Sequence, residues 1–191
     1  MVAPLLLIAL ILSAAPLAAQ TGQPSGQPSA SSSDPQAKPQ GSSGFTRPLA
    51  TAGSWKAFEG RSDDGTAICG LSSDTGGRYF AMKRYAGYDT ITIQIGAHAW
   101  KLPEGEKVEM NMRYDANPGW VAKGTVIHFG DGDAGLEFDV GQPELVRFRS
   151  EFRNSNVLRI TFNGALPDWQ VDLGGTSAVE TVFQDCMRKM K

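Results

Sequence analysis

Residues 169–186 of the chain read WQVDLGGTSAVETVFQDC, and this stretch decides how the domain closes. Its first five residues alternate between apolar and polar side chains, which is typical of a short strand, and Gly174-Gly175 marks a turn. The residues after the turn place Val179, Phe183 and Cys186 on one side of a helix. The stretch therefore predicts a strand, a glycine turn and an amphipathic helix that buries its cysteine.

The start of this helix carries a second signal. Ser177 and Glu180 have the spacing of a capping box, in which each side chain satisfies the free amide of the other residue. The same turn, Asp172-Leu-Gly-Gly-Thr176, is an alternative candidate for a phosphate site, because helix N-termini attract anions. Capping by Ser177 accounts for the residues without an anion, so we expect the capping box.

The N-terminal third differs in composition from the rest. Residues 1–19, MVAPLLLIALILSAAPLAA, contain no charged side chain and end in small residues, which is typical of a secretory signal peptide. We expect cleavage after Ala19. The alternative is a membrane anchor, which needs an apolar run of about 18 residues, but here proline interrupts the run and no basic flank follows it. The expected location is periplasmic or secreted, with no transmembrane segment after cleavage.

Residues 20–50 are rich in Gln, Ser, Gly and Pro, so we expect a disordered tether, and residues 51–191 are expected to form a single β-rich domain. The formal net charge of −2 gives no basic excess that would favour nucleic acid. The chain has two cysteines, Cys69 and Cys186, and an even pair in an exported protein predicts one disulfide. A redox-active pair is the alternative, but the two do not form a Cys-x-x-Cys motif.

Short alternating runs dominate the folded region, and one segment, 143–152, has apolar residues at helical spacing instead. The strand-like runs are 54–58, 66–71, 78–85, 90–95, 107–114, 120–122, 125–129, 136–140, 157–162 and 169–173. We expect a mainly β fold, an antiparallel β-sandwich or open barrel of about eight strands, with a short internal helix and a C-terminal helix.

Two acidic motifs are candidates for chemistry. Asp74-Thr75-Gly76 matches the tripeptide of aspartic proteases, but no second copy exists, so a hairpin turn is the better interpretation. Asp131, Asp133 and Glu137 have calcium-loop-like intervals, but Gly135 stands where the third acid of an EF-hand is required. We therefore favour a surface turn and expect no metal and no cofactor.

Four further side chains are candidates for lining a ligand cleft. They are Trp100, Trp120, His98 and His128. Met110 and Met112 share a strand face and offer soft ligands for copper, although methionines on such a face more often pack a core.

Taken together, Trp55 in the first predicted strand, the early Cys69, the sheet-rich middle and the closing pattern from Trp169 to Cys186 resemble exported proteins of the invasion-associated locus B type. The resemblance covers about residues 53–188 and implies an extracytoplasmic β-sandwich. That family is named for host-cell invasion and has no established enzymatic role. It supplies no catalytic residues to carry over.

These observations favour a non-enzymatic, exported binding or envelope-associated domain whose partner is an unknown envelope protein or glycan. One alternative is a metal-dependent or hydrolytic envelope enzyme that uses Asp74 or the acids from Asp131 to Asp139. A second alternative is an inhibitor or assembly factor of an envelope enzyme.

Overall fold

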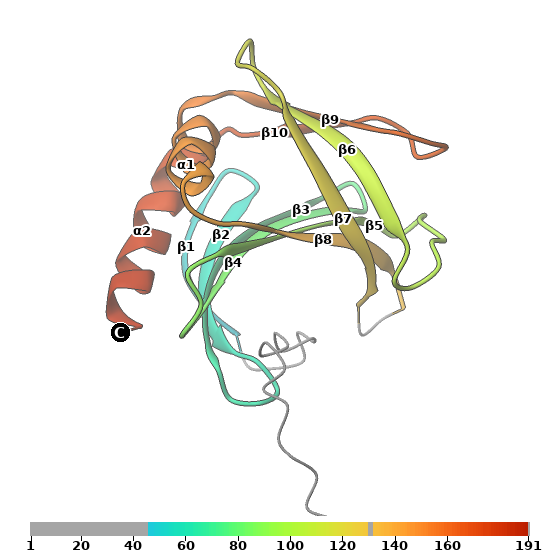
Figure 1. Cartoon of the computed structure of the whole chain (residues 1–191). Helices are drawn as coiled ribbons and strands as arrows, with labels where there is room; N and C mark the ends of the chain where they lie inside the picture. The colour runs from blue at the N-terminus through green and yellow to red at the C-terminus, as the bar shows by residue number, and fades with distance from the viewer. Residues whose placement is uncertain (1–45, 130–131, 191) are drawn as a thin grey trace, which may run out of the picture. The chain divides into compact units, whose positions relative to one another are not determined.

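A computed structural model describes residues 46–129 and 132–190, which form one curved β-sheet and two helices (Figure 1). The expected signal peptide and residues 20–45 of the expected tether lie outside the described residues. The strands are β1 (Thr46–Ala52), β2 (Trp55–Arg61), β3 (Ala67–Thr75), β4 (Arg78–Tyr85), β5 (Ile91–Ala97), β6 (Lys107–Tyr114), β7 (Trp120–His128), β8 (Ala134–Val140), β9 (Val157–Phe162) and β10 (Trp169–Asp172). The helices are α1 (Glu144–Asn154) and α2 (Thr176–Lys189).

All neighbouring strands pair antiparallel, in the order β1-β2-β3-β4-β5-β8-β7-β6-β9-β10. The expected mainly β fold with one internal and one C-terminal helix is confirmed, with ten strands in place of about eight. The strands differ from the expected runs in two places, one that adds a strand and one that merges two runs. Residues 46–50, expected in the tether, belong to β1, because their backbone pairs with β2 and Arg47 forms an ion pair of 2.6 Å with Glu59. The runs 120–122 and 125–129 join into the single strand β7.

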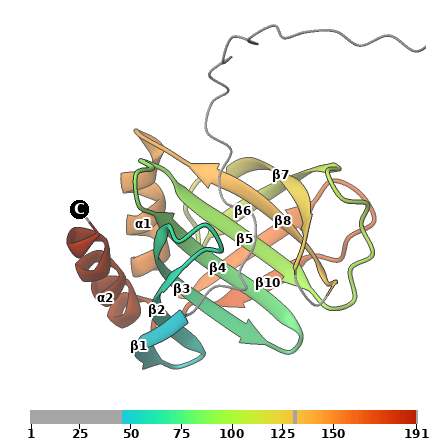
Figure 2. The same ribbon diagram turned by 90° about the horizontal axis from the view of Figure 1, so that it is seen from below.

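The sheet curls so that its two parts enclose a common core (Figures 1 and 2). We call β1–β5 and β8 the first half, and β7, β6, β9 and β10 the second half. Strict alternation in β6 shows why the sequence builds this core, since Val108, Met110, Met112 and Tyr114 are buried while the residues between them are exposed. Met110 and Met112 are fully buried, which agrees with their interpretation as core residues.

Helix α2 packs against β1, β2 and β3 and contacts α1, and both views show the two helices side by side. Cys186, near its C-terminal end, forms a disulfide with Cys69 of β3, with 5.9 Å between the two Cα atoms. The predicted disulfide is therefore confirmed. In the described part of the chain, neither helix has the combination of length and apolar character that crossing a bilayer requires.

The expected capping box at the start of α2 is wrong. Gly175 is the N-cap residue and adopts a left-handed conformation with φ of 97°, and no side chain caps the helix. A Cβ atom at Gly175 would overlap the carbonyl oxygen of Ala52 in β1, so glycine is required for the close approach of the turn to the sheet. Thr176 instead donates its hydroxyl to the carbonyl oxygen of Leu173, at 2.8 Å. Ser177 is exposed in the first turn.

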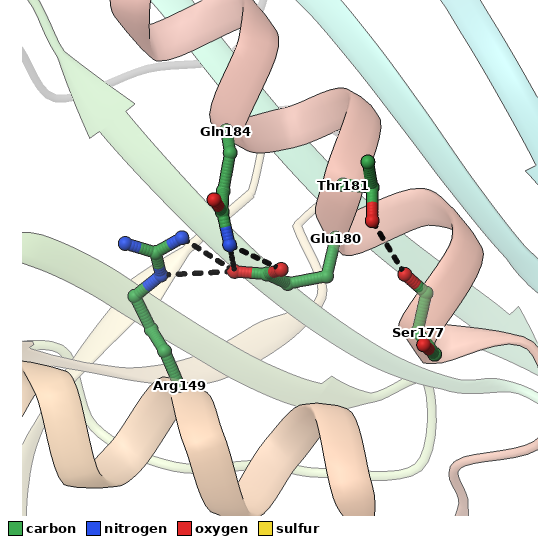
Figure 3. A network of polar contacts seen from close by, with 5 residues as sticks. All are labelled: Arg149, Ser177, Glu180, Thr181 and Gln184. Carbon is green, nitrogen blue, oxygen red and sulfur yellow. Dashed lines mark hydrogen bonds and ion pairs between the residues drawn. The ribbon is translucent and has the colours of Figure 1, made fainter.

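Glu180, the other member of the expected box, links the two helices (Figure 3). Its side chain is 1% exposed and accepts hydrogen bonds from the Nε of Arg149 in α1, at 3.0 Å, and from the Nε2 of Gln184, at 2.6 Å. A buried carboxylate needs a charged partner, and Arg149 is a stronger one than a neutral backbone amide. The tertiary ion pair therefore replaces the local cap.

Candidate functional site

Strands β7 and β8 pair along only part of their length. Residues 125–128 of β7 pair with residues 134–137 of β8. Beyond this point the described pairing of β7 is with β6 alone, and that of β8 is with β5 alone. Figure 1 shows the two strands separating, β7 rising to the β6–β7 turn and β8 running toward α1. Among the described strands, the edges at 120–124 and 138–140 therefore have no ladder partner on the side of this separation.

A groove of about 520 Å³ occupies this separation, and we call it the β7–β8 groove. Buried Met112 of β6 and Phe148 of α1 are among the residues that line it. Apolar side chains also come from both strands, with Trp120 and Ala122 on β7 and Phe138 on β8. Volumes of this order suit a small ligand or a short stretch of chain.

Charged residues line the groove beside these apolar walls. Lys123 lies on β7, whereas Glu137 and Asp139 lie on β8 and Glu144 begins α1. The Nε2 of Gln94 donates to Glu137 at 2.7 Å, and the hydroxyl of Thr92 donates to Asp139 at 2.9 Å, so β5 orients both carboxylates. Three carboxylates against one lysine make the groove lining acidic.

Glu137 and the two exposed acids of the groove differ in their surroundings. Lys83 of β4 interacts with Glu137 across the sheet, and burial lowers the pKa of Lys83 to about 8 against the attraction of that carboxylate. Asp139 and Glu144 are the exposed acids of the groove. Because these two carboxylates are exposed, a basic ligand could reach them from solvent.

Trp120 is held in place by helix α1. Its indole Nε1 donates to Glu151 at 2.6 Å, and the guanidinium group of Arg147 lies 4.2 Å from its ring centroid. Arg147 in turn donates to Glu151 at 2.7 Å and to the carbonyl oxygen of Pro118 at 2.9 Å. The rings of Trp120 and Phe148 pack in a T-shaped arrangement, with 5.6 Å between ring centroids. Three side chains, Glu151, Arg147 and Phe148, therefore hold the aromatic wall of the groove in place.

The four side chains predicted to line one cleft lie in different places. His98 contacts Asp133, and His128 contacts the carbonyl oxygen of Leu102 at 3.0 Å. Trp120 is at the opposite end of β7 from His128, about 26 Å away at the usual rise per residue of a strand. Trp100 is buried against Phe162. Of the four, Trp120 lines the β7–β8 groove.

The acidic candidates are also separated. Asp131 lies outside the described residues, Asp133 contacts His98, and Glu137 lines the groove. No three His, Cys, Asp or Glu side chains gather as a metal site within residues 46–129 and 132–190. Asp74 lies in the β3–β4 hairpin, as the turn interpretation predicts.

Sequence reasoning missed Val121, Phe138 and Asp139 as parts of one site. Val121 carried a signal, because it is an apolar residue on the outward side of an alternating strand and is 73% exposed. The partial pairing of β7 and β8 leaves no comparable signal in the sequence, because the point at which the two strands separate depends on the three-dimensional fold.

Comparisons with known proteins bear on the fold. No family model matches the chain, and no curated protein matches it by sequence. Among solved structures, the fold is similar to the crystal structure of invasion associated protein B from Bartonella henselae, with a TM-score of 0.51 and 12% sequence identity. The match covers 75% of this chain and 99% of that one. The likeness extends over the whole of that domain and supports the fold that the sequence resemblance implied.

Proposed function

We propose that the protein is an exported, non-enzymatic binding domain of the cell envelope. The β7–β8 groove is the observation that carries the binding role. It combines a rigid aromatic wall, an apolar lining and unpaired strand edges, which are the features of a surface that receives a partner.

Export is supported by two independent features. The first 19 residues have the composition of a signal peptide, and the Cys69–Cys186 disulfide belongs to an oxidising compartment. We infer a periplasmic or secreted location, with residues 20–45 acting as a tether ahead of β1. The partner is an envelope protein or glycan.

Site-specific photo-crosslinking tests the binding role in the full chain. A photoreactive residue at Val121, in the groove, should crosslink to an envelope component in cells that express the protein. The same residue at Val146, a valine on α1 that is 69% exposed and lies outside the groove, is the matched control. Equal crosslinking from both positions would contradict a binding role for the groove.

Fractionation and mass spectrometry of the same cells test export. The mature protein should appear outside the cytoplasm with Gln20 at its N-terminus. Cytoplasmic protein that retains residues 1–19 would overturn this part of the proposal.

A further inference from the structure

We propose that the β7–β8 groove binds an extended, basic peptide segment that adds as a strand to the free edge of β7. The inference rests on the proposed binding function and assigns its partner class. The preferred segment alternates apolar residues, which face into the groove, with lysine or arginine, which face outward.

The free edge supplies the backbone partners. In an antiparallel strand, alternate residues direct their N–H and C=O groups to opposite sides, so pairing with β6 uses only one side of residues 120–124. The other side faces the separation from β8, where the described ladder ends at Thr125 and Glu137. A free edge next to an apolar groove is the arrangement that strand addition uses in peptide recognition.

The groove is long enough for a short peptide. Residues 120–124 span about 13 Å, which matches four or five residues of extended chain. The unpaired end of β8 contains three residues, 138–140, so β7 offers the longer template.

The two sides of an added strand would meet different surfaces. Its inward side chains would contact Trp120, Ala122, Phe138 and Phe148, which are apolar. Its outward side chains would lie near Asp139 and Glu144, because Asp139 alternates with Phe138 on β8 and both acids are exposed. Lys123 alternates with Ala122 on β7 and lies on the same outward side, where the two acids outnumber it. The apolar side gives affinity, and the acidic side selects lysine or arginine over glutamate or aspartate.

The charge of the lining also argues against two other occupants. The segment of this chain outside the structure, residues 20–45, contains one lysine and few apolar side chains, so it lacks the alternation that the groove selects. A second copy that joined through the same groove would bring two acidic linings together. An alternating basic peptide is the occupant whose charge and spacing fit.

Titration of the full chain with the hexapeptide Lys-Val-Lys-Val-Lys-Val tests the proposal, read by calorimetry and by the change in total tryptophan fluorescence. We expect saturable binding that weakens as salt is added. The isomer Lys-Lys-Lys-Val-Val-Val and the peptide Glu-Val-Glu-Val-Glu-Val should bind weakly or not at all. Equal binding of the alternating peptide and its isomer would overturn the proposal.

N-methylated peptides test the backbone pairing. Methylating every valine amide, or every lysine amide, removes the donors on one edge of the peptide. At least one of these two peptides should lose binding by more than roughly tenfold, because each lost hydrogen bond contributes. Full binding of both would overturn strand addition.

A matched pair of double variants tests the acidic side. Asp139→Asn with Glu144→Gln should weaken hexapeptide binding roughly 3- to 10-fold, as expected for two exposed charge pairs. Glu104→Gln with Asp168→Asn removes the same number of exposed carboxylates outside the groove and should leave affinity unchanged. Equal affinity of both double variants would refute the charge selection.

Two further results would assign the groove to another occupant and overturn the proposal. One is a dimer, measured by light scattering, that the Asp139→Asn, Glu144→Gln variant alters. The other is binding of a synthetic peptide of residues 20–45 in place of the hexapeptide. Envelope crosslinks at Val121 without hexapeptide binding would leave the binding function standing and remove only the peptide assignment.

Discussion

The indole Nε1 of Trp55 in β2 donates a hydrogen bond of 3.0 Å to the backbone carbonyl oxygen of Asp172, the last residue of β10. The two residues are 117 positions apart, and they belong to opposite halves of the sheet. No ladder joins β1 to β10 among the described strands, so this bond helps to hold the curled sheet closed.

Trp55→Phe should destabilise the domain by about 2 kcal/mol, because it removes this bond and part of a fully buried side chain that packs edge-on against Phe80 and Phe152. Urea unfolding followed by circular dichroism measures the change. A loss below about 0.5 kcal/mol would show that the contact between the halves contributes little.

Breaking the disulfide should have a larger effect. Closing a loop of 117 residues restricts the unfolded chain, and the chain-entropy model gives about 4–5 kcal/mol for such a loop. Reduction, or the Cys69→Ser, Cys186→Ser double variant, should lower the Tm by roughly 10 °C. The double variant should not respond further to reducing agent, and a Tm indifferent to both changes would contradict the prediction.

Tyr114→Phe should stabilise the domain. The Tyr114 hydroxyl is fully buried and has no hydrogen-bond partner among the described residues, so its removal should gain about 1 kcal/mol at neutral pH.

The same variant should change stability at high pH. Burial, with a smaller effect from Glu151, raises the pKa of the Tyr114 phenol well above its usual value. Above pH 10 the unfolded phenol loses its proton while the folded one keeps it, so stability falls as pH rises, and Tyr114→Phe should reduce that fall. Urea unfolding between pH 9 and 11 measures the change. If the free energy of unfolding falls equally in the wild-type protein and in Tyr114→Phe, the raised pKa is not that of Tyr114.

The ion pair between the helices gives a prediction with an internal control. Arg149→Met leaves the buried carboxylate of Glu180 without its cation and should cost about 3 kcal/mol. Adding Glu180→Gln should recover most of the loss, because a neutral amide tolerates burial better than a carboxylate does. Additive losses in the double variant, measured by urea unfolding, would show that the two side chains do not interact.

The variants Gly175→Ala and Gly65→Ala distinguish two costs of replacing a glycine. One is the strain of a positive φ, and the other is a steric clash with a neighbouring strand. Both glycines have positive φ, 97° and 84°, but a Cβ at Gly65 meets nothing within 4 Å, whereas one at Gly175 overlaps Ala52. Gly65→Ala should cost about 1 kcal/mol and Gly175→Ala at least about 2 kcal/mol, measured by thermal unfolding. Equal losses would mean that the turn moves away from β1 without cost.

Much of the fold was predictable because it follows from local periodicity. The alternation in Lys107–Tyr114 and the helical spacing of Leu145, Phe148 and Phe152 each reflect burial of one face, and the structure shows both elements. The disulfide prediction followed from the even count of cysteines together with the expected signal peptide.

The predictions that were wrong or missing concern residues whose structural partners are distant in the sequence. Glu180 matched a local cap, but Arg149 of another helix takes its carboxylate. Residues 46–50 looked like tether by composition, yet backbone pairing with β2 needs no apolar side chain. The β7–β8 groove exists because two strands stop pairing, and neither strand encodes that event in its own alternation.

The disulfide has a consequence for chain cleavage. Every residue from β4 through β10, including both walls of the β7–β8 groove, lies between Cys69 and Cys186. A protease that cuts one peptide bond in this interval would produce two fragments that stay covalently joined. A protein cut once in this interval would therefore keep both walls of the groove covalently linked until a thiol reduced the disulfide.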